Sequence, residues 1–251
     1  MSENGICRLC LQEKELLKQS HIIPNFMFKE IKDEKNRFFQ FESKDIIEKK
    51  DRKKALQTGY FESNLLCKNC DNSILGGYER YGANSLYSPK IKNGPIVEGL
   101  VDTHGNRAFK VSNIDYVKFK LFLLSILWRA SISSHIFFSE VNLGPHEEKI
   151  RKMILDHNAK SDLDYPIIFG SILGNNTHFE NYISQPRMFK FNEHKLVLFV
   201  ITGIYYGFVV SSYVRDKESL KSRLNQKNEL IMSHIPKGKD VEHFLKIIGI
   251  K

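Results

Sequence analysis

The sequence predicts an α+β fold, divided into a small N-terminal domain and a larger α+β domain with an antiparallel sheet. Three observations predict this division. Two Cys-x-x-Cys pairs enclose short apolar segments near the N-terminus, a long apolar helical stretch follows residue 113, and β-branched and aromatic runs dominate after residue 164. The segment from Pro89 to Gly105 is rich in Gly and Pro. We therefore expect domains at residues 1–92 and 106–251.

All four cysteines of the chain, Cys7, Cys10, Cys67 and Cys70, belong to these two pairs. The spacing lets both sulfurs of a pair reach one ion at about 2.3 Å, and four thiolates suit one tetrahedral zinc ion. The long interval between the pairs is tolerable because loop-closure entropy grows only logarithmically with length. The sequence therefore predicts a structural Zn²⁺ in the N-terminal domain.

Disulfides and redox chemistry are the alternatives for the cysteines. Disulfides need an oxidising compartment, and the first residues, MSENGICRLC, show no basic start, apolar core or small-residue cleavage site. A redox Cys-x-x-Cys follows a strand in a βαβ unit, and no strand is expected before Cys7. Both alternatives are disfavoured, and we expect a cytoplasmic protein.

Charge and hydropathy favour a polyanionic partner and no membrane span. The formal charge of +9 and the pI near 9.2 favour binding to phosphates, although charge alone is weak support for nucleic-acid binding. The uncharged run from Leu196 to Val214 is nearly long enough to cross a bilayer. Its β-branched and aromatic residues, with Gly203 and Gly207 inside it, instead favour a buried β-hairpin that turns near Thr202.

The N-terminal part shows short elements between the cysteine pairs. Ile22 and Ile23 before Pro24 indicate a short strand that carries His21, because the residue before a proline is extended. The other elements expected here are a short helix capped by Asn25, a strand from Arg37 to Glu42, a charged connection from Lys44 to Lys54, a strand from Phe61 to Leu66 and a helix that begins at Asp71 or Asn72.

The C-terminal part begins with a long amphipathic helix, capped by Ser112 or Asn113, in which Trp128 and Arg129 are assigned to the core and the helix end. A second helix follows Gly144-Pro145. Further elements expected are strands at Tyr165 to Leu173, Met188 to Phe191, Leu196 to Ile201 and Ile204 to Ser212, and helices at Asp216 to Asn228 and Asp240 to Ile248. This domain shows no catalytic constellation, so we expect it to serve target recognition, homodimer formation or a regulatory protein partner.

The first third of the chain resembles the HNH endonuclease family. The resemblance is carried by the first cysteine pair, the segment Ser20-His21-Ile22-Ile23-Pro24, and the run Asn64-Leu-Leu-Cys-Lys-Asn-Cys before a polar helix start. It implies a zinc-stapled ββα-metal (HNH-like) domain and metal-dependent hydrolysis of phosphodiester bonds, with double-stranded DNA as the expected nucleic acid. It also implies a role in bacterial anti-phage defence, often under the control of a partner protein.

The resemblance implies roles for particular residues. His21 takes the place of the general base, Asn64 that of the residue that orients it, and Asp71 that of a ligand to the catalytic ion. These residue types suit the chemistry, because a histidine with a pKa near 6.5 can deprotonate water near neutral pH. A hard Mg²⁺ or Mn²⁺ prefers oxygen ligands such as Asp71 and the amide oxygen of Asn72, and Glu79 adds a carboxylate or forms a salt bridge.

One position departs from the family. The family has Asp or His immediately before the base, as a second metal ligand, and this chain has Ser20. A hydroxyl is a weaker ligand, so either the nearby carboxylates hold the ion with several waters or the site is degenerate. The second hypothesis is therefore a non-catalytic zinc-ribbon module that binds nucleic acid or a protein partner.

Overall fold

The computed structural model describes residues 3–41, 54–87, 94–101, 103, 105–172, 182–215 and 220–235. The expected connection from Lys44 to Lys54 lies almost wholly outside these residues, and the expected helix from Asp240 to Ile248 lies entirely outside them. Helices and a large sheet together confirm the α+β class.

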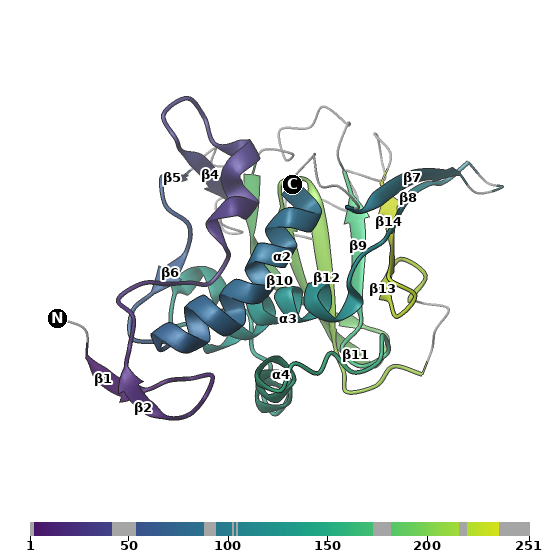
Figure 1. Cartoon of the computed structure of the whole chain (residues 1–251). Coiled ribbons are helices and arrows are strands. Elements are labelled where there is room, and N and C mark those ends of the chain that lie inside the picture. The colour runs from purple at the N-terminus through teal and green to yellow at the C-terminus, as the bar shows by residue number, and fades with distance from the viewer. Residues whose placement is uncertain are drawn as a thin grey trace.

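A ten-stranded sheet forms the centre of the molecule, in the order β5-β4-β10-β11-β12-β9-β14-β8-β7, with β13 paired to β14 (Figure 1). Its strands are β4 (Phe38–Phe41), β5 (Lys54–Leu56), β7 (Ile96–Val101), β8 (Arg107–Ser112), β9 (Ile167–Ser171), β10 (Tyr182–Phe191), β11 (His194–Ile201), β12 (Ile204–Val210), β13 (Leu224–Asn225) and β14 (Glu229–His234). Most pairs are antiparallel, as expected, but β4–β10 and β9–β14 are parallel. The sheet is therefore mixed.

The predicted hairpin is confirmed. β11 and β12 pair in register from Lys195 opposite Val210 to Ile201 opposite Ile204. Thr202 and Gly203 connect them with φ of 52° and 74°, and two positive φ values are what a two-residue hairpin turn with the sheet's twist requires. Most of the uncharged run, from Leu196 to Val210, thus belongs to two strands and their turn, and among the helices of the described residues none could span a membrane.

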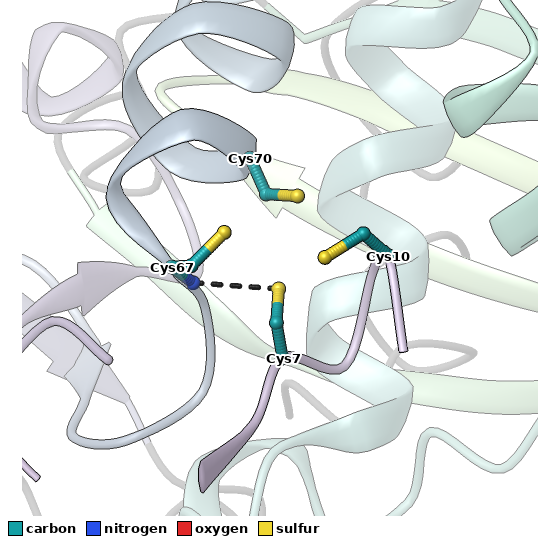
Figure 2. Close-up of side chains that lie close together, drawn as sticks. All are labelled: Cys7, Cys10, Cys67 and Cys70. Atoms are coloured by element: carbon teal, nitrogen blue, oxygen red, sulfur yellow. Dashed lines mark hydrogen bonds between the residues drawn. The ribbon is translucent and has the colours of Figure 1, made fainter. Parts of the chain in front are cut away.

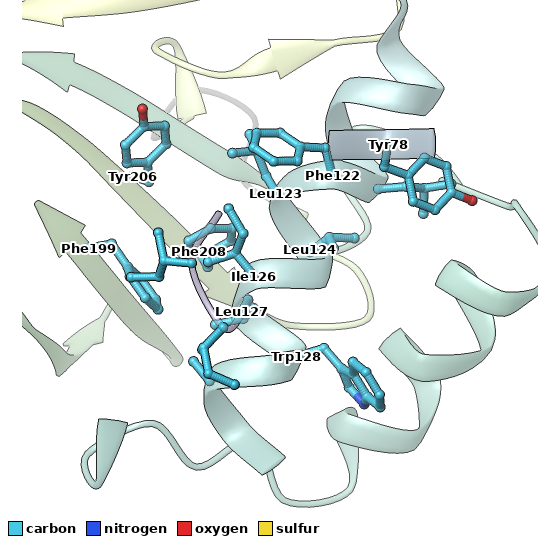
Figure 3. Close-up of a cluster of buried hydrophobic side chains, with 14 of the residues drawn as sticks. Tyr78, Phe122, Leu123, Leu124, Ile126, Leu127, Trp128, Phe199, Tyr206 and Phe208 are labelled. Carbon is cyan, nitrogen blue, oxygen red and sulfur yellow. The ribbon is translucent and has the colours of Figure 1, made fainter. Parts of the chain in front are cut away.

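Helix α3 (Tyr116–Ile132) lies between the sheet and the other helices. Its cap is Asp115, whose side chain accepts a hydrogen bond from Lys118 N at 3.0 Å, rather than the expected Ser112 or Asn113. The helix is not amphipathic, because nearly every residue from Phe119 to Ala130 is buried. Figure 3 shows Phe199 and Phe208 of the sheet on one side of α3 and Trp128 pointing away on the other. Packing on both sides removes the need for a polar face.

Helices α2 (Gly76–Tyr87) and α4 (His146–Leu155) both contact α3, and the short 3₁₀ helix η3 (Ile136–Phe138) lies between α3 and α4 in the chain.

Two other local predictions need correction. The expected linker from Pro89 to Gly105 contains β7, which pairs along its full length with β8. Part of the expected helix from Asp216 to Asn228 is strand β13, because Leu224 pairs with Leu230 across a turn.

The two predicted domains, at residues 1–92 and 106–251, share a sheet and a hydrophobic core. β4 and β5 come from the first range and join the sheet through β10, and one hydrophobic core extends from Cys7 to Leu230. The division into two domains remains a prediction, and the structure adds that the two ranges share a sheet and a core.

The N-terminal part contains two small strand pairs, β1 (Asn4–Ile6) with β2 (Glu13–Glu15) and β3 (Ser20–His21) with β6 (Phe61–Glu62). A 3₁₀ helix, η1 (Asn25–Ile31), follows β3, and a π-helix, η2 (Asn69–Leu75), leads into α2. β3, β6 and α2 follow one another in the order that the resemblance implies. Because β3 and β6 hold two residues each, the ββα-metal fold itself remains a prediction.

Candidate functional site

The four cysteine side chains converge on one point. Their sulfur atoms all lie within 4.8 Å of one another, and Figure 2 shows them directed at a common centre. A tetrahedron with metal–sulfur bonds of 2.3 Å has sulfur–sulfur distances of about 3.8 Å, so the cluster suits a structural zinc ion. Among the described residues, this is the one group of three or more Cys, His, Asp or Glu side chains close enough to hold a metal.

Local backbone structure holds the two pairs together. Cys7 N donates to Gln12 O at 3.0 Å, which closes the turn that carries Cys7 and Cys10 between β1 and β2. Cys67 N donates to Cys7 Sγ at 3.3 Å, and a single β-bridge joins Cys67 to Leu16. Amide donors to sulfur stabilise a thiolate ligand, so this geometry favours metal binding.

His21 lies at the end of β3, one chain position before buried Ile22, and pairs with Phe61 across the strand pair. Partial burial lowers its pKa, and the Arg129 guanidinium lowers it further, while the carboxylates of Glu79 and Asp71 oppose the shift. The imidazole is therefore neutral near pH 7, which is the form that can accept a proton.

Asp71 lies on η2, next to Cys70, and close enough to His21 for each group to affect the other's pKa. Burial raises the pKa of Asp71, Glu79 raises it further, and Arg129, Ser20 and His21 oppose these effects. The Ser20 hydroxyl is completely buried beside this carboxylate, without a well-formed hydrogen bond. A buried hydroxyl next to a partly desolvated carboxylate is a polar environment that suits a cation or water.

Arg129 is a site residue that the sequence analysis did not assign to the site. It is buried as expected, with 1% of its side chain exposed, but its Nη1 lies 2.7 Å from Glu79 Oε1 and donates to His21 O at 2.5 Å. An arginine at the end of the mostly apolar run from Leu121 to Trp128 was the available signal, because arginine is almost never fully buried without a partner.

Some of the predicted site residues lie close enough to interact, whereas others make different contacts or face solvent. His21, Asp71 and Glu79 interact electrostatically, as the preceding pKa effects show. Asn72 is exposed on η2, and Asn64 is exposed in a turn with φ of 58°, where its side chain donates to Glu3 Oε2 at 3.1 Å.

The amide that contacts His21 belongs to Asn25. Its Nδ2 lies 2.8 Å from His21 Nε2. The sequence analysis expected Asn25 to cap the following helix, but Pro24 occupies the cap position of η1 and no side chain caps that helix. The cap prediction was wrong because it treated Asn25 as a local backbone partner, whereas its side chain reaches other segments.

Comparisons of this chain with models of known protein families, with curated proteins and with solved structures gave no match. The site is therefore characterised by its own chemistry. It combines a cluster of four cysteines with a neutral histidine, two carboxylates and a buried arginine on adjacent elements.

Proposed function

We propose that this protein is a zinc-stapled, metal-dependent endonuclease of HNH type that hydrolyses phosphodiester bonds of nucleic acid, with double-stranded DNA as the first substrate to test. The observation that carries the proposal is that neutral His21 and Asp71 lie close enough to affect each other's pKa, and that Asp71 follows Cys70 of the cysteine cluster in the chain. A base, an acidic ligand and a structural metal cluster on adjoining short elements are the parts that such a reaction needs.

Each residue has a distinct role in this proposal. His21 would accept a proton from the attacking water, and Asp71, beside the buried Ser20 hydroxyl, would offer an oxygen ligand to Mg²⁺ or Mn²⁺. When bound, the divalent ion supplies positive charge that neutralises the scissile phosphate and the leaving oxygen. Glu79 is paired with Arg129, so its contribution is to position the helix and to tune the charge of the site.

The test is a cleavage assay with supercoiled plasmid, linear duplex and structured RNA, each with Mg²⁺, Mn²⁺ or EDTA. We expect metal-dependent cleavage, which His21→Ala lowers by about 10²- to 10⁴-fold because a general base contributes that much. His194→Ala, which changes a histidine at the start of β11, is the matched control and should retain activity. Zinc content and thermal unfolding establish that both variants are folded. Equal inactivity of wild type and His21→Ala on all substrates would reject the nuclease.

A second candidate is a non-catalytic zinc module that binds nucleic acid or a protein partner. The Arg129–Glu79 ion pair favours it, because Glu79 forms the salt bridge that was the alternative to a metal contact, and a buried guanidinium already neutralises its carboxylate. This reading predicts binding without cleavage. For nucleic acid, the logarithm of the affinity should fall linearly with the logarithm of the salt concentration, because phosphate contacts release counterions. Cleavage that disappears in His21→Ala would exclude it.

A further inference from the structure

We propose that Asn25 is a positioning residue that fixes the tautomer of His21 and covers its basic nitrogen in the resting protein. The proton of the neutral ring is then on Nδ1 and the lone pair is on Nε2, where it accepts a hydrogen bond from the Asn25 amide. Water or substrate must replace this amide before His21 can take up a proton. Only this last, catalytic consequence rests on the proposed function.

The tautomer follows from the two contacts of the Asn25 side chain. Its Oδ1 accepts a hydrogen bond from Gly59 N at 3.0 Å, and its Nδ2 lies 2.8 Å from His21 Nε2. A backbone N–H can only donate, so the amide oxygen faces Gly59 and the NH₂ group faces the imidazole. Because an NH₂ group has no acceptor, His21 Nε2 must be the unprotonated nitrogen.

The absence of a side chain at Gly59 lets its backbone N–H approach the Asn25 amide oxygen closely. A Cβ atom built at Gly59 would lie 2.6 Å from Asn25 Oδ1 and 3.0 Å from Phe28 Cε2. Phe28 is itself fully buried and stacks on Phe38 with ring centroids 4.5 Å apart. A glycine at position 59 is therefore required for the backbone to approach the amide this closely.

The same contact opposes proton uptake by His21. A proton on Nε2 would place an imidazole N–H against the Asn25 NH₂ group, so two donors would face each other. Asn25 is exposed to solvent, which allows water or a phosphate oxygen to reach and replace its amide. In the resting protein the Asn25 amide thus covers His21 Nε2, and substrate binding displaces this amide.

The experiment is a long-range ¹H–¹⁵N correlation spectrum of the full-length, zinc-loaded, ¹⁵N-labelled protein at about pH 8, where the ring is neutral. His21→Gln identifies the signals of His21. We expect an unprotonated nitrogen at Nε2 and an N–H at Nδ1 in the wild type. Asn25→Ala should give a mixture of tautomers, and Asn25→Asp should place the proton on Nε2, because a carboxylate can only accept.

A second variant perturbs the same amide from its other side. Gly59→Ala must displace Asn25 Oδ1, so it should produce the tautomer mixture of Asn25→Ala while Asn25 itself remains. The matched control is Asn64→Ala, which removes the amide that the family resemblance assigns to this role and should leave the His21 signals unchanged.

Two results would overturn the inference: a protonated Nε2 in the wild type, or wild-type His21 signals in folded Asn25→Ala or Gly59→Ala. These results are independent of cleavage. An inactive wild type with the expected tautomer would reject the proposed nuclease and keep the role of Asn25, whereas an active nuclease with the other tautomer would reject the role of Asn25 alone.

Discussion

At the scale of single residues, Lys120 shows how a charged group is accommodated inside the core. It lies on α3 with 2% of its surface exposed, and its Nζ donates to Ser161 O and Asp164 O at 2.6 Å and to Tyr116 Oη at 3.0 Å. Burial lowers the pKa of Lys120 to about 7, although the nearby carboxylates of Asp164 and Asp162 oppose this shift. Its hydrogen bonds are satisfied, but its charge remains unfavourable.

This lowered pKa predicts how stability depends on pH. Between about pH 7 and 10.4 the unfolded chain binds the Lys120 proton and the folded chain releases it, so the free energy of unfolding should rise with pH. We expect a slope on the order of 1 kcal/mol per pH unit relative to Lys120→Met, which cannot titrate. Urea unfolding of both proteins at pH 7.5, 8.5 and 9.5 measures it. Parallel profiles for the two proteins would contradict the burial effect.

At the scale of elements, the packing of α2 against α3 determines where the site residues lie. α2 carries Glu79, α3 carries Arg129, and the two helices approach closely at Gly82. A Cβ atom at Gly82 would lie 2.7 Å from the Phe122 ring, whereas Gly77 on the same helix has only Arg80 Nη2 within 4 Å, at 3.9 Å. Gly82 therefore permits a close helix contact, whereas Gly77 has space for a side chain.

Alanine at these two positions should have opposite effects. Gly82→Ala should lower the free energy of unfolding by about 1–3 kcal/mol, because the added methyl group overpacks the contact with Phe122. Gly77→Ala should raise it by about 0.5–1 kcal/mol, because alanine restricts the unfolded chain and has space in the helix. Urea unfolding at one pH compares both with the wild type. Changes of the same sign would show that helix propensity, and not this contact, dominates.

At the scale of the whole molecule, the cysteine cluster is attached to the rest of the protein by side chains of distant elements. Arg151 of α4 donates a hydrogen bond to Leu9 O, in the turn that carries Cys7 and Cys10. Cys7, Cys67 and Cys70 belong to the same hydrophobic core as α3 and the sheet. Loss of the metal should therefore act first on the N-terminal segments and on their contacts with α4.

Zinc removal tests this arrangement. Elemental analysis should find close to one zinc per chain, and Cys67→Ala should lose it, because structural zinc contributes folding free energy directly. Hydrogen exchange should then show lost protection at residues 3–23 and 61–75, while the β11–β12 hairpin stays protected by its own sheet contacts. Asn72→Ala changes an exposed residue beside the cluster and should keep both zinc and protection. A zinc-free protein with full N-terminal protection would contradict the metal assignment.

The sequence by itself determined the features that depend on local signals. The cysteine spacing predicted the cluster, and the β-branched run with its Thr202-Gly203 turn predicted the β11–β12 hairpin. The helix predicted after Ser112 or Asn113 and the helix predicted after Gly144-Pro145 are also present, at Tyr116–Ile132 and His146–Leu155. In each case, neighbouring residues supply the information, through ligand spacing, turn geometry or helical periodicity.

Only the tertiary structure decided which side chains meet. The contacts of Arg129 with Glu79 and His21, and the contact of Asn25 with Gly59, join segments that are far apart along the chain. The parallel pairing of β4 with β10 has the same origin. Hydrogen bonds, ion pairs and strand pairing depend on distance in space, which is set by the packing of the whole core and not by residue order.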